Sequence, residues 1–144
     1  MRVELVEIAG IEKRHETVWK IRALVLENRD PVTDALDRWQ QKHLRDYKAI
    51  IKVMQMTGQQ SRVLNPKHVK KSSNPDHGEV YEMLAYAGVA RLMFFYDDED
   101  AALIVCTNGY EKGWGGSDSQ DAAFARCAAF KKLYLQKKHE RKIR

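Results

Sequence analysis

Three β-rich runs decide the fold of this chain, and they lie within residues 80–108, VYEMLAYAGVARLMFFYDDEDAALIVCTN. The runs are Val80–Ala85, Ala90–Tyr96 and Ala101–Asn108. Their β-branched and aromatic residues favour strands. The links between them, Tyr86-Ala87-Gly88 and Asp97–Asp100, are short and turn-rich, and such short links join antiparallel neighbours. The stretch therefore predicts a three-stranded antiparallel meander.

A helix is predicted after the meander. The glycine-rich residues 113–116 lead to Ser117 and Asp118, and apolar residues then recur from about Ser119 to Lys138. Acidic residues lie early in this segment and lysines lie late, which complements the helix dipole. The chain is thus predicted to end in a helix followed by a basic tail, residues 139–144.

The region before the meander predicts one strand and one or two helices. Residues 18–26 alternate between apolar and polar side chains, which is typical of a half-buried strand. Asp30 and Pro31 suit the cap and the first position of a helix, and apolar residues continue at helical spacing to Gly58. Local rules leave open one long helix or a hairpin bent near Lys42 and His43. Residues 1–16 form an arm or an extra strand, and residues 58–78 form a polar connection.

Composition bounds the class of protein. The chain has 144 residues, which suits a single domain, and it carries a net charge of +5 with a pI near 9.2. A positive balance favours polyanion partners such as nucleic acid. Cys106 and Cys127 have no zinc-site spacing and lie in apolar company, so we expect buried free thiols. Neither a signal peptide nor a membrane span is evident, which leads us to expect a cytoplasmic protein.

Several segments resemble the HigB branch of the RelE superfamily of toxins, a branch also described as phage-derived proteins. They are Pro31 with the helix that follows it, Glu79–Leu84, Ala90–Tyr96 and Asn108–Lys112. The last three are similar to the family's tyrosine-glutamate strand, its arginine-led strand ending in aromatics and its glycine-aromatic-x-lysine stretch. The similarity spans about residues 18–138, and the order and spacing of these short motifs carry it.

The resemblance implies an α+β, RelE-like fold in a single domain, with an N-terminal strand, two helices, the meander and the C-terminal helix. It implies a toxin of a toxin–antitoxin pair that cleaves mRNA in the ribosomal A site and uses neither metal nor cofactor. It also implies two kinds of partner. One is the ribosome with its mRNA, and the other is a small helix-turn-helix antitoxin that neutralises the toxin.

Metal-free RNA cleavage needs proton transfer and cations at the phosphate, and three residues are candidates for these roles. Arg91 suits a phosphate clamp because its guanidinium stays charged and binds two oxygens at once. Lys112 and Tyr110 can transfer protons if burial or nearby charge shifts their pKa values. Each also has an ordinary structural role open to it: Arg91 as a salt-bridged strand residue, Lys112 as a loop lysine and Tyr110 as a packing residue.

Other side chains are candidates for binding RNA, namely Lys67, Lys70, Lys71, Trp114 and His77. The lysines can neutralise phosphates and Trp114 can stack on a base. We expect His77, like His68, to be a solvent-exposed loop residue. The lysines precede the first meander strand, so they reach the same end of the sheet as Arg91 only if their loop folds back.

A tight turn at residues 97–100 would place Arg91 opposite about Cys106, and the earlier turn would place it opposite about Met83. Arg91 then lies at the sheet end from which residues 86–89 and 108–114 emerge. The N-terminus of the last helix is expected near this end, where it favours anions. The acidic turn is expected at the opposite end.

Two departures from the family keep other functions open. Leu84 stands where the family usually has an arginine, and Gly113 begins a stretch where it often has a second lysine. These changes motivate a second hypothesis, a binding protein on the same fold that no longer cuts RNA. Inhibition of DNA gyrase, as in the related ParE branch, is a third.

Overall fold

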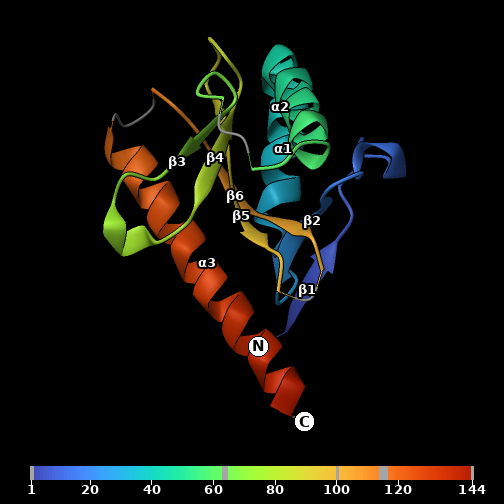
Figure 1. Cartoon of the computed structure of the whole chain (residues 1–144). Coiled ribbons are helices and arrows are strands. Elements are labelled where there is room, and N and C mark those ends of the chain that lie inside the picture. Colours follow the sequence, from blue (N-terminus) through green and yellow to red (C-terminus); the bar gives the residue numbers. More distant parts are fainter. Residues whose placement is uncertain (1, 63–64, 100, 114–116, 144) are drawn as a thin grey trace.

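A six-stranded mixed sheet lies between two helical layers in the computed structural model (Figure 1). The structure describes residues 2–62, 65–99, 101–113 and 117–143, without the side chains of 117–119 and 141–143. The strands are β1 (Val3–Val6), β2 (Lys20–Leu26), β3 (Val69–Lys71), β4 (Tyr81–Leu84), β5 (Ala90–Asp97) and β6 (Leu103–Glu111). The α-helices within the described ranges are α1 (Pro31–Lys42), α2 (Leu44–Gly58) and α3 (Ser117–Ile143).

The predicted α+β class and the meander are confirmed. The order of the strands in the sheet is β1-β2-β6-β5-β4-β3, and β4, β5 and β6 pair antiparallel as consecutive hairpins. The strand predicted at residues 18–26 is β2, and it pairs parallel with β6. The sheet is wider than the meander and one N-terminal strand, because β1 and β3 extend its two edges. Residues 58–78 are therefore more than a connection, since β3 lies within them.

Two helices, rather than one long helix, precede the meander. His43 leaves the helical conformation, with φ of −141° and ψ of 61°, and separates α1 from α2. At the start of α1, the Asp30 side chain accepts a hydrogen bond from the Thr33 N–H, and Pro31 occupies the first turn. The chain therefore bends at the place that the sequence left open, near Lys42 and His43.

Both faces of the sheet are covered, α1 and α2 lying on one and α3 on the other (Figure 1). Alternate residues of β5 point to the two layers, so Leu92 and Phe94 belong to one core while Met93 and Phe95 belong to the other. This two-sided burial explains why β5 is an unbroken apolar run. Cys106 and Cys127 are buried free thiols, as predicted. No helix in the described ranges is long and apolar enough to cross a membrane.

The register of β5 and β6 differs from the one predicted. Phe94, rather than Arg91, lies opposite Cys106, and Arg91 lies opposite Tyr110. The turn is longer than assumed, because Asp97 pairs with Leu103, and a register shift follows between Met93 and Phe94. A bulge of this kind changes the partners of all residues beyond it. The correction brings two of the predicted catalytic residues side by side.

The acidic turn is tied to the C-terminal half of α3. The buried Asp97 carboxylate accepts hydrogen bonds from the Tyr134 hydroxyl at 2.6 Å and from Lys138 Nζ at 2.9 Å. Burial alone would raise the pKa of Asp97, but these hydrogen bonds outweigh it and the pKa lies below its ordinary value. Asp98 pairs with Arg62, and Glu99 pairs with Lys138.

We predict that Asp97→Asn destabilises the protein at neutral pH by about 1–3 kcal/mol, the usual worth of hydrogen bonds to a charged group. The lowered pKa means that the folded state binds the Asp97 proton more weakly than the unfolded state. The stabilisation is therefore present at neutral pH and lost as the pH falls through the folded-state pKa. Urea denaturation between pH 7 and pH 2 should show the two proteins converging in acid. A constant difference across this range would contradict the role given to the charge.

Candidate nucleic-acid interface

Three predicted site residues meet at one end of the sheet. We call this the hairpin end; there residues 85–89 join β4 to β5, and β6 finishes at Glu111. Arg91 and Tyr110 are direct cross-strand neighbours on the face that α3 covers. The Lys112 N–H donates to the carbonyl of Val89 at 2.7 Å, so Lys112 lies beside the same turn. The corrected register therefore gathers Arg91, Tyr110 and Lys112.

A buried carboxylate, Glu82, stands beneath this group, and the sequence analysis did not single it out. Its side chain is 1% exposed and lies on β4. The Gln120 amide donates to one Glu82 oxygen at 3.1 Å, and the Tyr110 hydroxyl donates to the other at 3.4 Å. The Nε atom of Arg91 lies 4.0 Å from Glu82 Oε1. Gln120 is in the first turns of α3, so the contact also places the N-terminal part of that helix at the hairpin end.

The Arg91 guanidinium is consequently not free. Arg91 is 6% exposed, and its Nη1 donates to the carbonyls of Ala90 at 2.9 Å and Gly88 at 3.1 Å. With Glu82 beside it, the positive charge is already balanced under the surface. A phosphate could use this guanidinium only by displacing the carboxylate or by neutralising it.

Burial governs the protonation of the groups around Arg91. Desolvation raises the pKa of Glu82, against the hydrogen bond from Gln120 and the charges of Arg91 and Lys70. Desolvation also raises the pKa of Tyr110, and the adjacent Glu82 raises it further. A phenol in this position keeps its proton at neutral pH, which makes Tyr110 a hydrogen-bond donor rather than a general base.

Leu84 lies on the same face of the sheet as Arg91, and it contributes no positive charge there. It lies opposite Arg91 in the β4–β5 ladder and is buried, so an apolar side chain fills the position where the resemblance leads one to expect an arginine. Lys70, on the edge strand β3, is the cross-strand partner of Glu82 and is exposed. The buried part of the site thus holds one cation and one carboxylate.

Free positive charge at the hairpin end comes instead from the surface. Lys112 is exposed and has no ion-pair or hydrogen-bond partner for its side chain among the described residues. The nearby Glu111 carboxylate is occupied by Arg38 and by the Trp39 indole N–H. Lys67 is exposed too, and its Nζ lies 5.5 Å from the centroid of the Tyr86 ring.

The loop before β3 folds back, as it must for its lysines to reach the sheet end that holds Arg91. β3 runs antiparallel to β4, and the Leu84 N–H donates to the carbonyl of His68 at 2.9 Å. Lys67 is thereby brought beside the hairpin end. Lys71 points along the edge and pairs with Glu79, its Nζ 3.6 Å from Glu79 Oε1.

His77 is not the exposed loop residue that was predicted. Its side chain is only 8% exposed, because Nδ1 lies 2.8 Å from the Ser72 hydroxyl and Nε2 lies 3.7 Å from Asp121 Oδ1. The ring also packs near Phe124. These contacts fasten the loop to α3. His68 is only partly exposed, and Trp114 lies outside the described residues.

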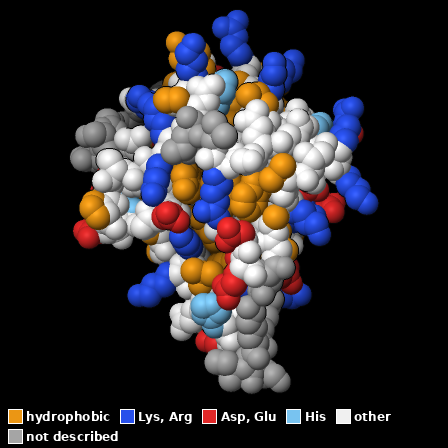
Figure 2. Space-filling view, in the orientation of Figure 1, with side chains coloured by type: hydrophobic (Ala, Val, Ile, Leu, Met, Phe, Trp, Pro, Cys, Tyr) orange, Lys and Arg blue, Asp and Glu red, His pale blue; other side chains and the backbone are white. Residues whose placement is uncertain are grey.

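The β4–β5 turn and the acidic β5–β6 turn lie at opposite ends of the view (Figure 1). Figure 2 shows several Lys and Arg side chains at the top, where Figure 1 places the β4–β5 turn beside the upper ends of α1 and α2, and others on both sides of the molecule; the β5–β6 turn lies toward the lower part. Asp98 of the β5–β6 turn is paired with Arg62, and Glu99 is paired with Lys138 and His139. Arg91 and Asp97 lie at opposite ends of β5, so the acidic turn is at the far end of the meander from Arg91, as predicted.

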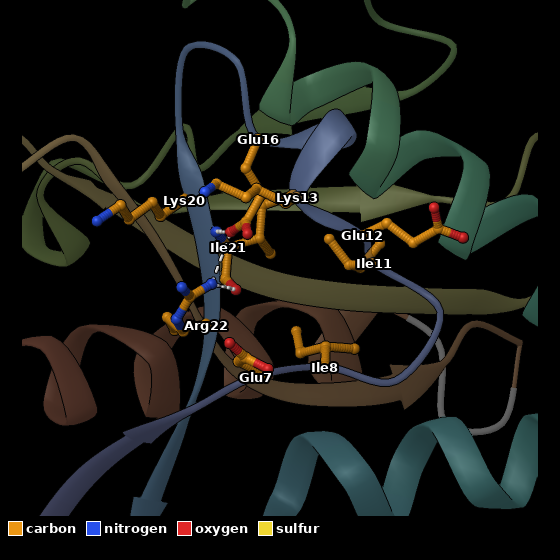
Figure 3. Close-up of a pocket in the computed structure, with 9 residues that line it drawn as sticks. All are labelled: Glu7, Ile8, Ile11, Glu12, Lys13, Glu16, Lys20, Ile21 and Arg22. Carbon is orange, nitrogen blue, oxygen red and sulfur yellow. Dashed lines mark hydrogen bonds and ion pairs between the residues drawn. The ribbon is translucent and has the colours of Figure 1, made fainter.

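A hollow of about 580 Å³ lies elsewhere, against the N-terminal arm (Figure 3). Its inward carboxylate, Glu16, is held 2.6 Å from Arg22 Nη1 and accepts the Ile21 N–H at 2.6 Å. The other residues that line it are Glu7, Ile8, Ile11, Glu12, Lys13 and Lys20. None of the predicted site residues lines this hollow, so it does not contribute to the site described above.

Comparison with known protein families, with curated proteins and with solved structures finds no match for this chain. Among the residues that the structure describes, no three His, Cys, Asp or Glu side chains gather as metal ligands would. The evidence for the candidate interface is therefore the arrangement of its residues.

We predict that the Glu82–Arg91 pair is strongly coupled. Arg91→Met should destabilise the fold by about 3–5 kcal/mol, because it leaves a buried carboxylate without its cation. The double variant Glu82→Gln/Arg91→Met should recover most of that loss, since no uncompensated charge remains. Free energies of unfolding from urea titrations of the wild type, Glu82→Gln, Arg91→Met and the double variant give the coupling directly. Losses that simply add would contradict the pairing.

Proposed function

We propose that this chain is a RelE/HigB-type toxin that binds RNA at the ribosome and inhibits translation, with the hairpin end as its RNA-binding surface. The observation that carries the proposal is the pair of exposed lysines there, Lys67 and Lys112, which have no ion-pair partner among the described residues. Free surface cations attract phosphate oxygens and release counterions on binding. The acidic turn lies at the other end of the meander, away from these lysines.

The order of the elements supports the proposed family. From β2 to α3 the chain contains a strand, two helices, an antiparallel meander and a final helix in the order that the resemblance implies, with the additional edge strand β3 between α2 and the meander. Arg91, Tyr110 and Lys112 occupy one end of the meander. We propose a small helix-turn-helix antitoxin as a partner, because the resemblance to this family implies one.

Inhibition by binding fits the buried charges better than cleavage does. RNA cleavage without a metal needs cations that stabilise charge developing on the phosphate. Glu82 balances Arg91, and Leu84 replaces a second cation, so the buried part of the site has no net positive charge to offer. We therefore propose that the protein binds RNA without cleaving it.

Metal-free cleavage is the second candidate, and the adjacency of Arg91 and Tyr110 favours it. Tyr110 keeps its proton at neutral pH and could donate it to a leaving oxygen, although its raised pKa makes it a weak acid, while Lys112 and Arg91 would contact the phosphate. This candidate requires Glu82 to be displaced or protonated when RNA enters. It predicts new mRNA ends that disappear in Arg91→Ala.

Induced expression without an antitoxin separates these candidates. We predict that growth and protein synthesis fall while mRNA 5′ ends, mapped by sequencing, remain as in uninduced cells. Lys67→Ala/Lys112→Ala should relieve the inhibition at equal protein level. New mRNA ends that depend on Arg91 would contradict binding without cleavage and would support metal-free cleavage. Unimpaired growth with the wild-type protein abundant in the cell would contradict both candidates.

RNA binding can be tested separately through its dependence on salt. We predict that Lys67→Ala/Lys112→Ala reduces the slope of log affinity against log salt concentration for single-stranded RNA by about 1.4, since each lost phosphate contact removes roughly 0.7. The matched control is Lys20→Ala/Lys132→Ala, two exposed lysines on β2 and α3 away from the hairpin end. An equal reduction in the control would show that binding follows net charge alone.

A further inference from the structure

We infer that Tyr86 is a stacking platform for one unpaired base of single-stranded RNA, and this inference rests on the RNA binding proposed above. Tyr86 lies in the turn between β4 and β5 and is 65% exposed. The other large hydrophobic side chains exposed in the described ranges are the aliphatic Val18 and Leu44. Single exposed apolar residues are ordinary on protein surfaces, so exposure by itself would not assign a role. The setting of the ring does.

The turn that carries Tyr86 is held rigidly. The Asp46 carboxylate, from α2, accepts hydrogen bonds from the N–H groups of Val89 at 2.6 Å and Ala90 at 2.9 Å. Gly88 allows this close approach, because a Cβ there would lie 2.5 Å from Asp46 Oδ1. Arg91 Nη1 donates to the Gly88 carbonyl from the other side. A ring on a fixed turn loses little conformational freedom when a base stacks on it.

The charges around the ring suit a nucleotide. Lys67 Nζ lies over the ring, 5.5 Å from its centroid, so a base would stack on the opposite face of the ring, and Lys112 is joined to the turn through its N–H bond to Val89. A base on the ring would therefore place its backbone phosphates within the influence of two exposed ammonium groups. The Asp46 carboxylate, which lies beside the turn, accepts both backbone N–H bonds through Oδ2, so part of its negative charge is balanced by these dipoles.

This combination selects single strands. Stacking on a side chain requires a base that is not already stacked and paired, and it tolerates any base because every base has a π-face. Duplex RNA can still contact Lys67 and Lys112 through its phosphates. The inference thus separates an aromatic contribution, specific to single strands, from an ionic contribution that both forms of RNA share.

The test measures binding of fluorescein-labelled oligo(A) and of a duplex RNA of equal length by anisotropy, at several salt concentrations. We predict that Tyr86→Ala weakens oligo(A) binding by about 5- to 150-fold, the range expected for one stacked base. The duplex should bind almost unchanged. Because tyrosine carries no charge, the salt slope should stay the same, whereas Lys67→Ala should lower it by about 0.7. Tyr86→Trp should restore or improve binding, and Leu44→Ala serves as the control for an exposed apolar residue.

The outcomes distinguish this inference from the proposal beneath it. Equal binding of oligo(A) by wild type and Tyr86→Ala, with the lysine variants impaired, overturns the stacking role and leaves RNA binding in place. An equal loss on duplex and single strand also overturns it, because it would point to a damaged turn. Circular dichroism and thermal melting of Tyr86→Ala check the fold. A wild-type protein that binds neither RNA overturns both.

Discussion

The meander is covered on both faces, and this constraint places the buried side chains at the candidate interface. In a strand that is buried on both sides, a shift by one residue would send each side chain into the wrong layer. The register shift between Met93 and Phe94 therefore has a consequence at a distance: it sets Arg91 against Tyr110. The same ladder sets Leu84 against Arg91. The chemistry available at the hairpin end follows from these pairings.

Burial also explains why the charged residues of the site divide into two groups. Arg91 and Glu82 lie under α3, where an isolated ion would be costly, and each supplies the charge that the other needs. Lys67 and Lys112 lie outside this layer, exposed and without an ion-pair partner among the described residues. A site with a neutral interior and a cationic rim is suited to holding a polyanion, and it lacks the buried positive charge that phosphoryl chemistry uses.

Much of the fold could be predicted because local signals and tertiary packing agree. The helix start at Asp30 and Pro31 and the run Ala90–Tyr96 follow rules that the structure obeys. The edge strand β3 escaped prediction because its three residues, Val69-Lys70-Lys71, carry no periodicity and owe their conformation to pairing with β4. The parallel β2–β6 pairing escaped too, since it joins segments far apart in sequence.

The candidate site was less predictable than the fold, for physical reasons. Arg91 and Tyr110 could be named from residue type, but their adjacency depends on a bulge that no local pattern marks. Glu82 had one signal, a single acid within an apolar strand, yet nothing in the sequence shows that Arg91 faces it. His77 was misjudged because its partners, Ser72 and Asp121, come together only when the loop packs on α3.

The most direct test of the account is a map of where RNA touches the protein, obtained by titrating single-stranded RNA into isotopically labelled protein and following backbone amide chemical shifts. The account predicts that the changes concentrate at residues 85–89 and at Lys67 and Lys112, with residues 97–99 undisturbed. Changes centred on the β5–β6 turn, or spread evenly over the lysines of the whole surface, would contradict it.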